Sequence, residues 1–327
     1  HLLKRGRKKE KEISEDYYTF IIDIYSTNSL CEFVNMFGKS ITDSLRPFGR
    51  GVWEKFINTV TSLKSEISFD INGLPTWSVG LGNITNPSST LDEIFKYLSC
   101  ADKPCIVAID EFQQIGEMPD NVSIQKRLRS VWQHQKMVSY CLFGSKKHTM
   151  MNVFQKRNMP LYQFGDFKFL GKIPTEKWTD YIVSHFADRN RVISEELAAM
   201  ICTAVDNHSS YVQQLSWIIF SLIDEGECVE ERHLALGVDS LLNSQEQLFM
   251  QQIEPLTAYQ MNFLRCIIDG NHDNFGESET RETYNLGSVS NITRLKTALV
   301  EKDLVEMNGR KLYITDPVFA MWFKRNV

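Results

Sequence analysis

The fold of this chain is decided by the stretch Pro104-Cys105-Ile106-Val107-Ala108-Ile109-Asp110-Glu111-Phe112-Gln113-Gln114. After the proline, which ends whatever element precedes it, small and β-branched apolar residues follow one another without alternation. That pattern predicts a strand buried on both faces of a parallel sheet. Two adjacent carboxylates, Asp110 and Glu111, come where the strand must end. Ligands of open parallel sheets bind at the carboxyl ends of the strands, so we expect chemistry at this pair.

An apolar strand that ends in two acids has the form of a Walker B motif. In such a motif the first acid, here Asp110, would hold Mg²⁺ on a nucleoside triphosphate. The second acid, Glu111, would polarise the attacking water. The simpler alternative is a buried strand followed by two solvated acids.

The composition is that of an ordinary soluble globular protein, with 43% hydrophobic and 24% charged residues in 327 positions. This length allows two or three domains with sizeable cores. A net charge of −5 argues against a protein that coats nucleic acid through bulk charge. The seven cysteines form no C-x-x-C pair, and the sequence has neither a signal peptide nor an apolar run long enough to span a membrane. We therefore expect a cytoplasmic protein with reduced thiols and no membrane partner.

Three more apolar segments, separated by helical patterns, predict that a parallel α/β sheet is built from residues 17–25, 104–110, 138–144 and 167–170. The strand at 138–144 ends in Gly144-Ser145. A polar residue at this point stands beside the Walker B acids and can report the γ-phosphate, so Ser145 is a candidate binding residue. The alternative is that Gly144-Ser145 is only a turn.

The second half of the chain changes to helical patterns. Four helices joined by short links over residues 174–250 predict a compact helical lid. Residues 257–327 follow the order helix, helix, helix, β-hairpin with an Asn308-Gly309 turn, which is typical of a winged helix. Basic and acidic residues balance in this block, so we favour a protein partner over DNA. Its apolar terminal run, residues 318–323, likewise suggests docking on protein.

In their order and spacing, these segments resemble the archaeal-ATPase family, AAA-like P-loop ATPases of the STAND type. The resemblance covers nearly the whole chain and rests on the strand at 17–25, Pro104–Gln114, Phe143-Gly144-Ser145, the lid and the winged helix. It implies a P-loop NTPase core in residues 1–173, binding of ATP and Mg²⁺, and slow hydrolysis used as a switch. It also implies Asp110 for Mg²⁺, Glu111 for the water and Ser145 at the sensor position. The competing hypothesis is a non-catalytic regulatory module that binds protein or DNA through the winged helix.

One feature of that family is missing from the sequence. No G-x-x-x-x-G-K-[ST] loop, which would cradle the β- and γ-phosphates, occurs in residues 1–327. The segment His1–Arg5 resembles the tail of the helix that follows this loop in the family. We therefore expect the natural protein to carry the strand, the loop and the helix immediately before His1, and residues 1–327 alone to bind ATP weakly.

Overall fold

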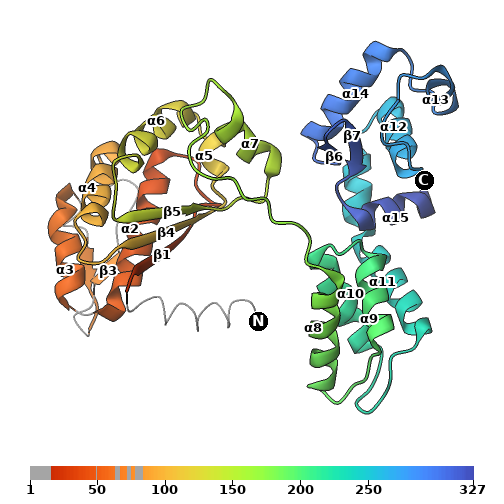
Figure 1. The fold of residues 1–327 in the computed structure, drawn as a ribbon, viewed down its shortest axis with the longest axis horizontal. Helices are drawn as coiled ribbons and strands as arrows, with labels where there is room; N and C mark the ends of the chain where they lie inside the picture. Colours follow the sequence, from red (N-terminus) through yellow and green to blue (C-terminus); the bar gives the residue numbers. More distant parts are fainter. Residues whose placement is uncertain (1–15, 49, 63–66, 72–74, 78–83) are drawn as a thin grey trace. The chain divides into compact units, whose positions relative to one another are not determined.

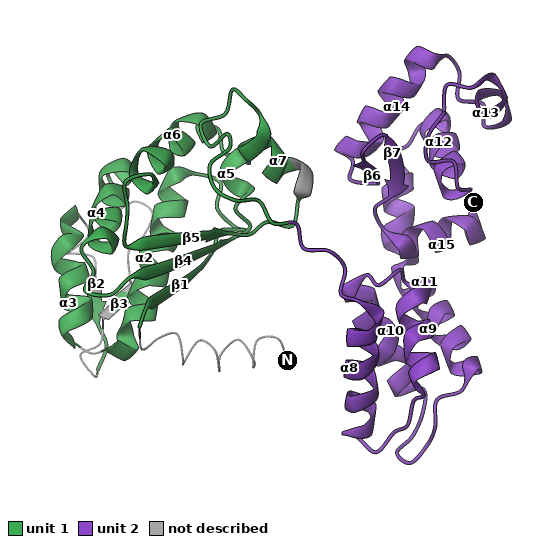
Figure 2. Ribbon diagram, viewed as in Figure 1, with its two compact units in different colours: residues 1–168 green, residues 169–327 purple. Residues whose placement is uncertain are grey.

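A computed structural model describes residues 16–48, 50–62, 67–71, 75–77 and 84–327 of the chain (Figure 1). The predicted helix tail at His1–Arg5 lies outside these residues. The chain divides into two compact units, unit 1 with residues 1–168 and unit 2 with residues 169–327 (Figure 2). Among the described residues, no helix is both long and apolar enough to cross a membrane.

Unit 1 is organised by a three-stranded parallel sheet. Its strands are β1 (Tyr18–Asp23), β4 (Cys105–Asp110) and β5 (Val138–Leu142), in the order β1-β4-β5. The register pairs Asp23 with Asp110, so that β1 and β4 end at the same edge. These are three of the four predicted strands, and the prediction of a parallel α/β sheet is confirmed.

Two long helices of unit 1, α2 and α4, begin at side chains that cap them. The Ser29 hydroxyl accepts a hydrogen bond from the Glu32 N–H at the start of α2, and the Asn86 side chain accepts one from the Ser89 N–H at the start of α4.

The remaining elements of unit 1 surround the parallel sheet in sequence. The hairpin of β2 (Ile67–Phe69) and β3 (Pro75–Trp77) is antiparallel. The helices of this unit are α2 (Leu30–Leu45), the short 3₁₀ helix η1 (Arg46–Phe48), α3 (Arg50–Thr59), α4 (Pro87–Ser99), α5 (Gln114–Glu117), α6 (Asn121–Trp132) and α7 (Lys147–Gln155).

One face of the sheet is packed, and the other is open within the described part of the chain. Phe20 and Val107, on the packed face, are 1% and 0% exposed. On the opposite face Ile21 is 63% exposed and Cys141 is also exposed. Within the same part of the chain, β5 pairs with β4 and with no other strand. The prediction of strands buried on both faces is therefore wrong for β1 and β5 in the described part of the chain, whereas Ile106 and Ala108 of β4 are half-buried on the same face.

The predicted strand at residues 167–170 is also wrong. This segment has no strand structure, and Phe169 and Leu170 are 56% and 83% exposed. Apolar residues favour a strand only where a neighbouring strand can pair with them, and no described strand pairs with this segment. The segment instead joins the two units, whose boundary falls between Lys168 and Phe169, five residues before the predicted end of the core at 173.

Unit 2 contains the predicted helical lid and the predicted winged helix. The Asn308-Gly309 turn joins two antiparallel strands as expected, with Gly309 at a positive φ of 63°. The lid elements are α8 (Thr175–Ala187), α9 (Glu195–Ala204), α10 (Ser209–Ser221) and α11 (Glu231–Ile253). The winged-helix elements are α12 (Ala258–Ile268), α13 (Ser278–Thr283), α14 (Val289–Glu301), β6 (Val305–Asn308), β7 (Lys311–Ile314) and α15 (Pro317–Asn326).

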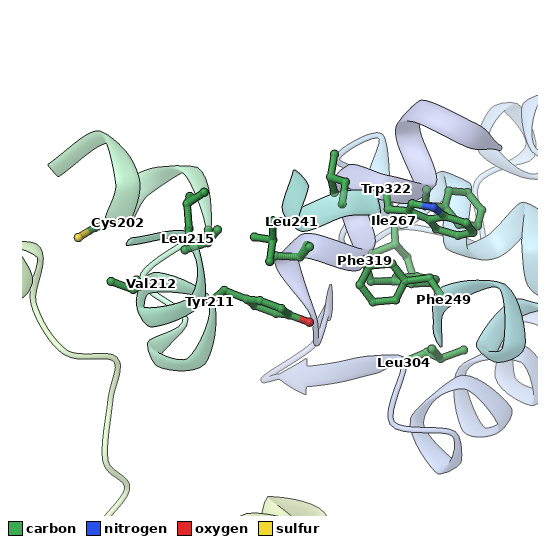
Figure 3. Packing of buried hydrophobic residues seen from close by; sticks show 14 of the residues in the cluster. Cys202, Tyr211, Val212, Leu215, Leu241, Phe249, Ile267, Leu304, Phe319 and Trp322 are labelled. Atoms are coloured by element: carbon green, nitrogen blue, oxygen red, sulfur yellow. The ribbon is translucent and has the colours of Figure 1, made fainter. Parts of the chain in front are cut away.

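The lid and the winged helix share one hydrophobic core, part of which is shown in Figure 3. The Phe249 ring of α11 lies 5.5 Å from the Phe319 ring and 5.6 Å from the Trp322 ring of α15. The Tyr211 hydroxyl of α10 donates a hydrogen bond to Asp316 at 2.5 Å. Residues 174–250 and 257–327 therefore belong to one compact unit, which α11 holds together.

This packing changes the interpretation of the apolar terminal run. Phe319, Trp322 and Phe323 are each at most 2% exposed, because α15 packs on α11 within unit 2. The prediction that this run docks on the ATPase core or on a partner is wrong for these buried side chains. The run instead packs against α11 of the lid, so a partner of the winged helix would have to contact other side chains.

Candidate functional site

Two aspartates lie side by side at the carboxyl ends of β1 and β4. Asp110 is the last residue of β4 and is exposed, and its register partner Asp23 ends β1. The Asp110 Oδ1 atom accepts a hydrogen bond from the Glu111 N–H at 2.9 Å. The Asp23 Oδ1 atom accepts one from the Tyr25 N–H, also at 2.9 Å. Both carboxylates are therefore oriented by the backbone of the turns that follow their strands.

Glu111 occupies a backbone conformation that is unusual for a residue other than glycine. Its φ is +56°, in the left-handed region, which costs about 1–2 kcal/mol for an L-residue. The next residue, Phe112, anchors the turn, because it is fully buried and its N–H donates to the Phe143 carbonyl at 2.8 Å. The Gln114 side chain donates to the Tyr25 carbonyl at 2.9 Å. The surrounding structure thus holds Glu111 in its strained position.

The structure brings Ser145 to Glu111, although 33 residues separate them in the sequence. The Ser145 hydroxyl donates a hydrogen bond to Glu111 Oε2 at 3.0 Å. The Gln113 side-chain amide also donates to Oε2. Glu111 is half-buried, whereas Ser145 is exposed. The ends of β4 and β5 are therefore joined through one carboxylate oxygen.

Sequence reasoning missed two polar residues at this site. Asp23 could have been found because the strand at 17–25 was predicted, and neighbouring parallel strands end at the same sheet edge. Gln113 had a weaker signal, an amide two residues after the second acid. The contact between the two side chains is made in the turn at Glu111, which the sequence pattern did not predict.

The aspartate pair offers carboxylate oxygens of the kind that Mg²⁺ takes as ligands. Mg²⁺ takes oxygen ligands and commonly uses one or two carboxylates, with waters and phosphate oxygens completing its shell. Asp110 and Asp23 offer two such carboxylates at one sheet edge. Among the described residues there is no group of three or more His, Cys, Asp or Glu side chains that could hold a metal without a substrate.

A separate groove of about 1040 Å³ lies in unit 2, between α8 and α10. It is lined by aromatic side chains, among them Trp178, Tyr181 and Trp217, and by Arg189. Trp217 is 68% exposed. Asp188 and Glu225 also line the groove, which belongs to a different unit from Asp110 and Glu111.

Comparisons with known proteins agree with the architecture. Residues 247–325 match the family model described as "Probable winged helix domain". The fold resembles the Walker-type ATPase of Pyrococcus abyssi, with a TM-score of 0.61 and 14% identity over 94% of this chain and 84% of that one. It also resembles the ORC2 protein of Aeropyrum pernix, solved with ADPNP and ADP, with a TM-score of 0.57 and 11% identity over 98% of this chain and 82% of that one. No curated protein matches the chain. At these identities, the likeness shows the fold.

Proposed function

We propose that this chain, which has the P-loop ATPase fold of those structures and a C-terminal winged helix, is a nucleotide-dependent ATPase that works as a switch. One observation carries the proposal. The two predicted site residues Glu111 and Ser145, from the ends of different strands, meet at 3.0 Å beside Asp110. Two solvated acids after a buried strand would not require a strained turn and a contact across the sheet edge.

Each residue has one proposed task. Asp110, with Asp23 beside it, would hold the Mg²⁺ that accompanies ATP. The ion would neutralise negative charge that develops on the phosphates during hydrolysis. Glu111 would accept a hydrogen bond from the attacking water and orient it toward the γ-phosphorus. Ser145 would sense the γ-phosphate by transferring its hydroxyl hydrogen bond from Glu111 to a phosphate oxygen.

The role of Asp110 is testable by nucleotide binding alone. For Asp110→Asn we expect the Kd for Mg²⁺–ATP to rise at least roughly tenfold, because an amide is a poorer ligand for Mg²⁺ than a carboxylate. Binding of ATP in the presence of a chelator should change less than about twofold. The control is Asp120→Asn, since Asp120 is exposed and caps α6 without a side-chain hydrogen bond. Calorimetric titration of the natural protein measures these constants, and an unchanged Mg²⁺–ATP affinity would contradict the assignment.

We infer that a phosphate-binding loop complements these residues. The open sheet face and the unpaired outer edge of β5, both within the described residues, support a strand beside β5 and a helix over Ile21 and Cys141. An exposed parallel edge leaves backbone donors and acceptors without partners, which proteins generally avoid. We propose that this strand and this helix carry the phosphate-binding loop.

Thiol labelling tests whether a further helix covers the sheet face that carries Cys141. We expect Cys141 of the natural protein to react with a maleimide at least about tenfold more slowly than Cys228, because reactivity follows exposure. Cys228 is exposed in unit 2 and serves as the reactive reference. Cys105 should not react, since burial raises the pKa of its thiol to about 12. Labelling at neutral pH followed by peptide mass spectrometry gives the rates. Equal rates at Cys141 and Cys228 would show that the face stays open.

The second candidate, a DNA-binding module, is favoured by the winged-helix match at 247–325. Electrostatics argue against it, because residues 257–327 carry no surplus of basic residues with which to displace counterions. Of the two cations on α14 that could contact DNA, Lys296 lies over the Phe275 ring at 4.9 Å, while Arg294 is exposed. We therefore propose a protein partner for the winged helix.

DNA binding at physiological salt separates the two candidates. We expect the natural protein to bind duplex DNA no more tightly than the micromolar range typical of non-specific contacts, roughly 10⁻⁶ M or weaker. Fluorescence anisotropy with a labelled duplex at several salt concentrations measures this. Tight, sequence-selective binding that Arg294→Ala abolishes would establish the DNA-reading function instead.

A further inference from the structure

Gln113 is a buried polar residue whose amide is directed at the site. It is 1% exposed, although glutamine is usually found at the surface. Burying an amide without a hydrogen bond is costly, and the bond that Gln113 makes goes to Glu111 Oε2. The reverse orientation of the amide would place its oxygen against the carboxylate, where two acceptors repel. The contact with Glu111 therefore determines which way the amide faces.

The strand end of β5 is shaped to hold this amide. A Cβ atom on Gly144 would lie 2.4 Å from Gln113 Oε1 and 2.7 Å from Met150 Cγ. The φ of Gly144 is not in the left-handed region, so the backbone conformation does not demand glycine here. A side chain at position 144 would therefore displace the Gln113 amide or the Met150 side chain. Gly144-Ser145 is thus more than a turn, since its first residue accommodates Gln113 and its second contacts Glu111.

The two donors leave the carboxylate ready for a different partner. Both bind Glu111 Oε2, and in the part of the chain that the structure describes Oε1 accepts no hydrogen bond. Both donors are neutral, so they orient the carboxylate without pairing its charge. A lysine or arginine in the place of Gln113 would do the opposite, because an ion pair would compete with the hydrogen bond from water. This arrangement suits a group that must accept a hydrogen bond in a defined direction.

We propose that Gln113 is a positioning residue, which holds the Glu111 carboxylate in place for the attacking water and acts only through Glu111. This inference rests on the proposed function of Glu111. Ser145 is expected to leave Glu111 when it contacts a γ-phosphate, whereas Gln113 belongs to the same turn and can keep its bond. The amide of Gln113 is therefore the donor that orients Glu111 throughout a hydrolytic cycle.

The main test uses Gln113→Met, which keeps the length and the apolar volume of the side chain and removes its donor. We expect kcat for ATP hydrolysis by the natural protein to fall about tenfold or more, the effect of losing a supporting residue. KM and the Kd for Mg²⁺–ATP should stay within about twofold, because Gln113 is not proposed to touch the nucleotide. Gly144→Ala should lower kcat in the same direction by displacing the amide. Gly51→Ala in α3, where an added Cβ meets nothing within 4 Å, is the matched control.

A double-mutant cycle separates positioning from a general structural role. In the Glu111→Gln background, Gln113→Met should have no further effect on hydrolysis, since its only route to the reaction is gone. Multiplicative effects, or an unchanged kcat in Gln113→Met, would overturn the proposal. Parental hydrolysis by Glu111→Gln would instead refute the proposed role of Glu111.

A crystal structure of the Gln113→Met variant tests directly whether the Gln113 amide holds the Glu111 carboxylate in place. The Glu111 carboxylate should move away from the Ser145 hydroxyl or become disordered. A carboxylate that keeps its place without the amide would overturn the inference even if the role of Glu111 stood.

Discussion

Glu111→Gln should slow ATP hydrolysis by the natural protein roughly a hundredfold or more, the range for loss of a positioned base. The amide keeps the shape of the side chain and can still meet Ser145, but it cannot accept a proton from water. Nucleotide binding should persist, because Glu111 is not proposed to hold the phosphates or the metal. Steady-state phosphate release and equilibrium binding of ATP measure the two quantities.

The matched control for this change is Glu117→Gln, on α5 of the same unit. Glu117 is exposed and pairs with Lys146 at 3.2 Å. The substitution therefore removes one carboxylate close in sequence to Glu111 and leaves Glu111 itself unchanged. Its hydrolysis rate should stay near the parental value. Glu111→Gln hydrolysing at the parental rate would show that the acid has another role.

Phe249→Ala should lower the free energy of unfolding of unit 2 by roughly 3–5 kcal/mol, the usual cost of removing a buried phenylalanine ring. Phe249 is fully buried in α11 and packs against two aromatic rings of α15. Because α11 also belongs to the lid, the loss should reach both segments. Denaturant unfolding monitored by hydrogen exchange should show α9 and α14 losing protection in one transition.

Leu248→Ala provides the control for this substitution. The neighbouring Leu248 is 49% exposed on the same helix, so its truncation should cost less than about 1 kcal/mol. If the winged helix stayed folded while the lid unfolded, residues 174–250 and 257–327 would be separate domains.

Local patterns in the sequence were sufficient for much of the fold. The strand at Cys105–Asp110, the helices of unit 2 and the winged-helix order all follow from hydrophobic period and turn residues, which act over a few neighbouring positions. The place of Asp110 and Glu111 follows as well, because the end of a buried parallel strand is where polar side chains reach the sheet edge.

Only the tertiary structure decided which segments meet. A run such as Phe167–Leu170 has the composition of a strand, but pairing requires a neighbour that no local pattern reveals, and the segment became a connection. Phe319 and Trp322 are likewise buried because they pack against α11, a helix far away in the sequence.

The same division holds within the candidate site. The sequence by itself determined that two acids end a buried strand and that a serine ends the next one. The contact of Ser145 and Gln113 with one oxygen of Glu111 depends on the left-handed turn at Glu111 and on the space left by Gly144. Backbone strain and close packing are properties of the folded chain, because many residues distant in sequence must together impose them.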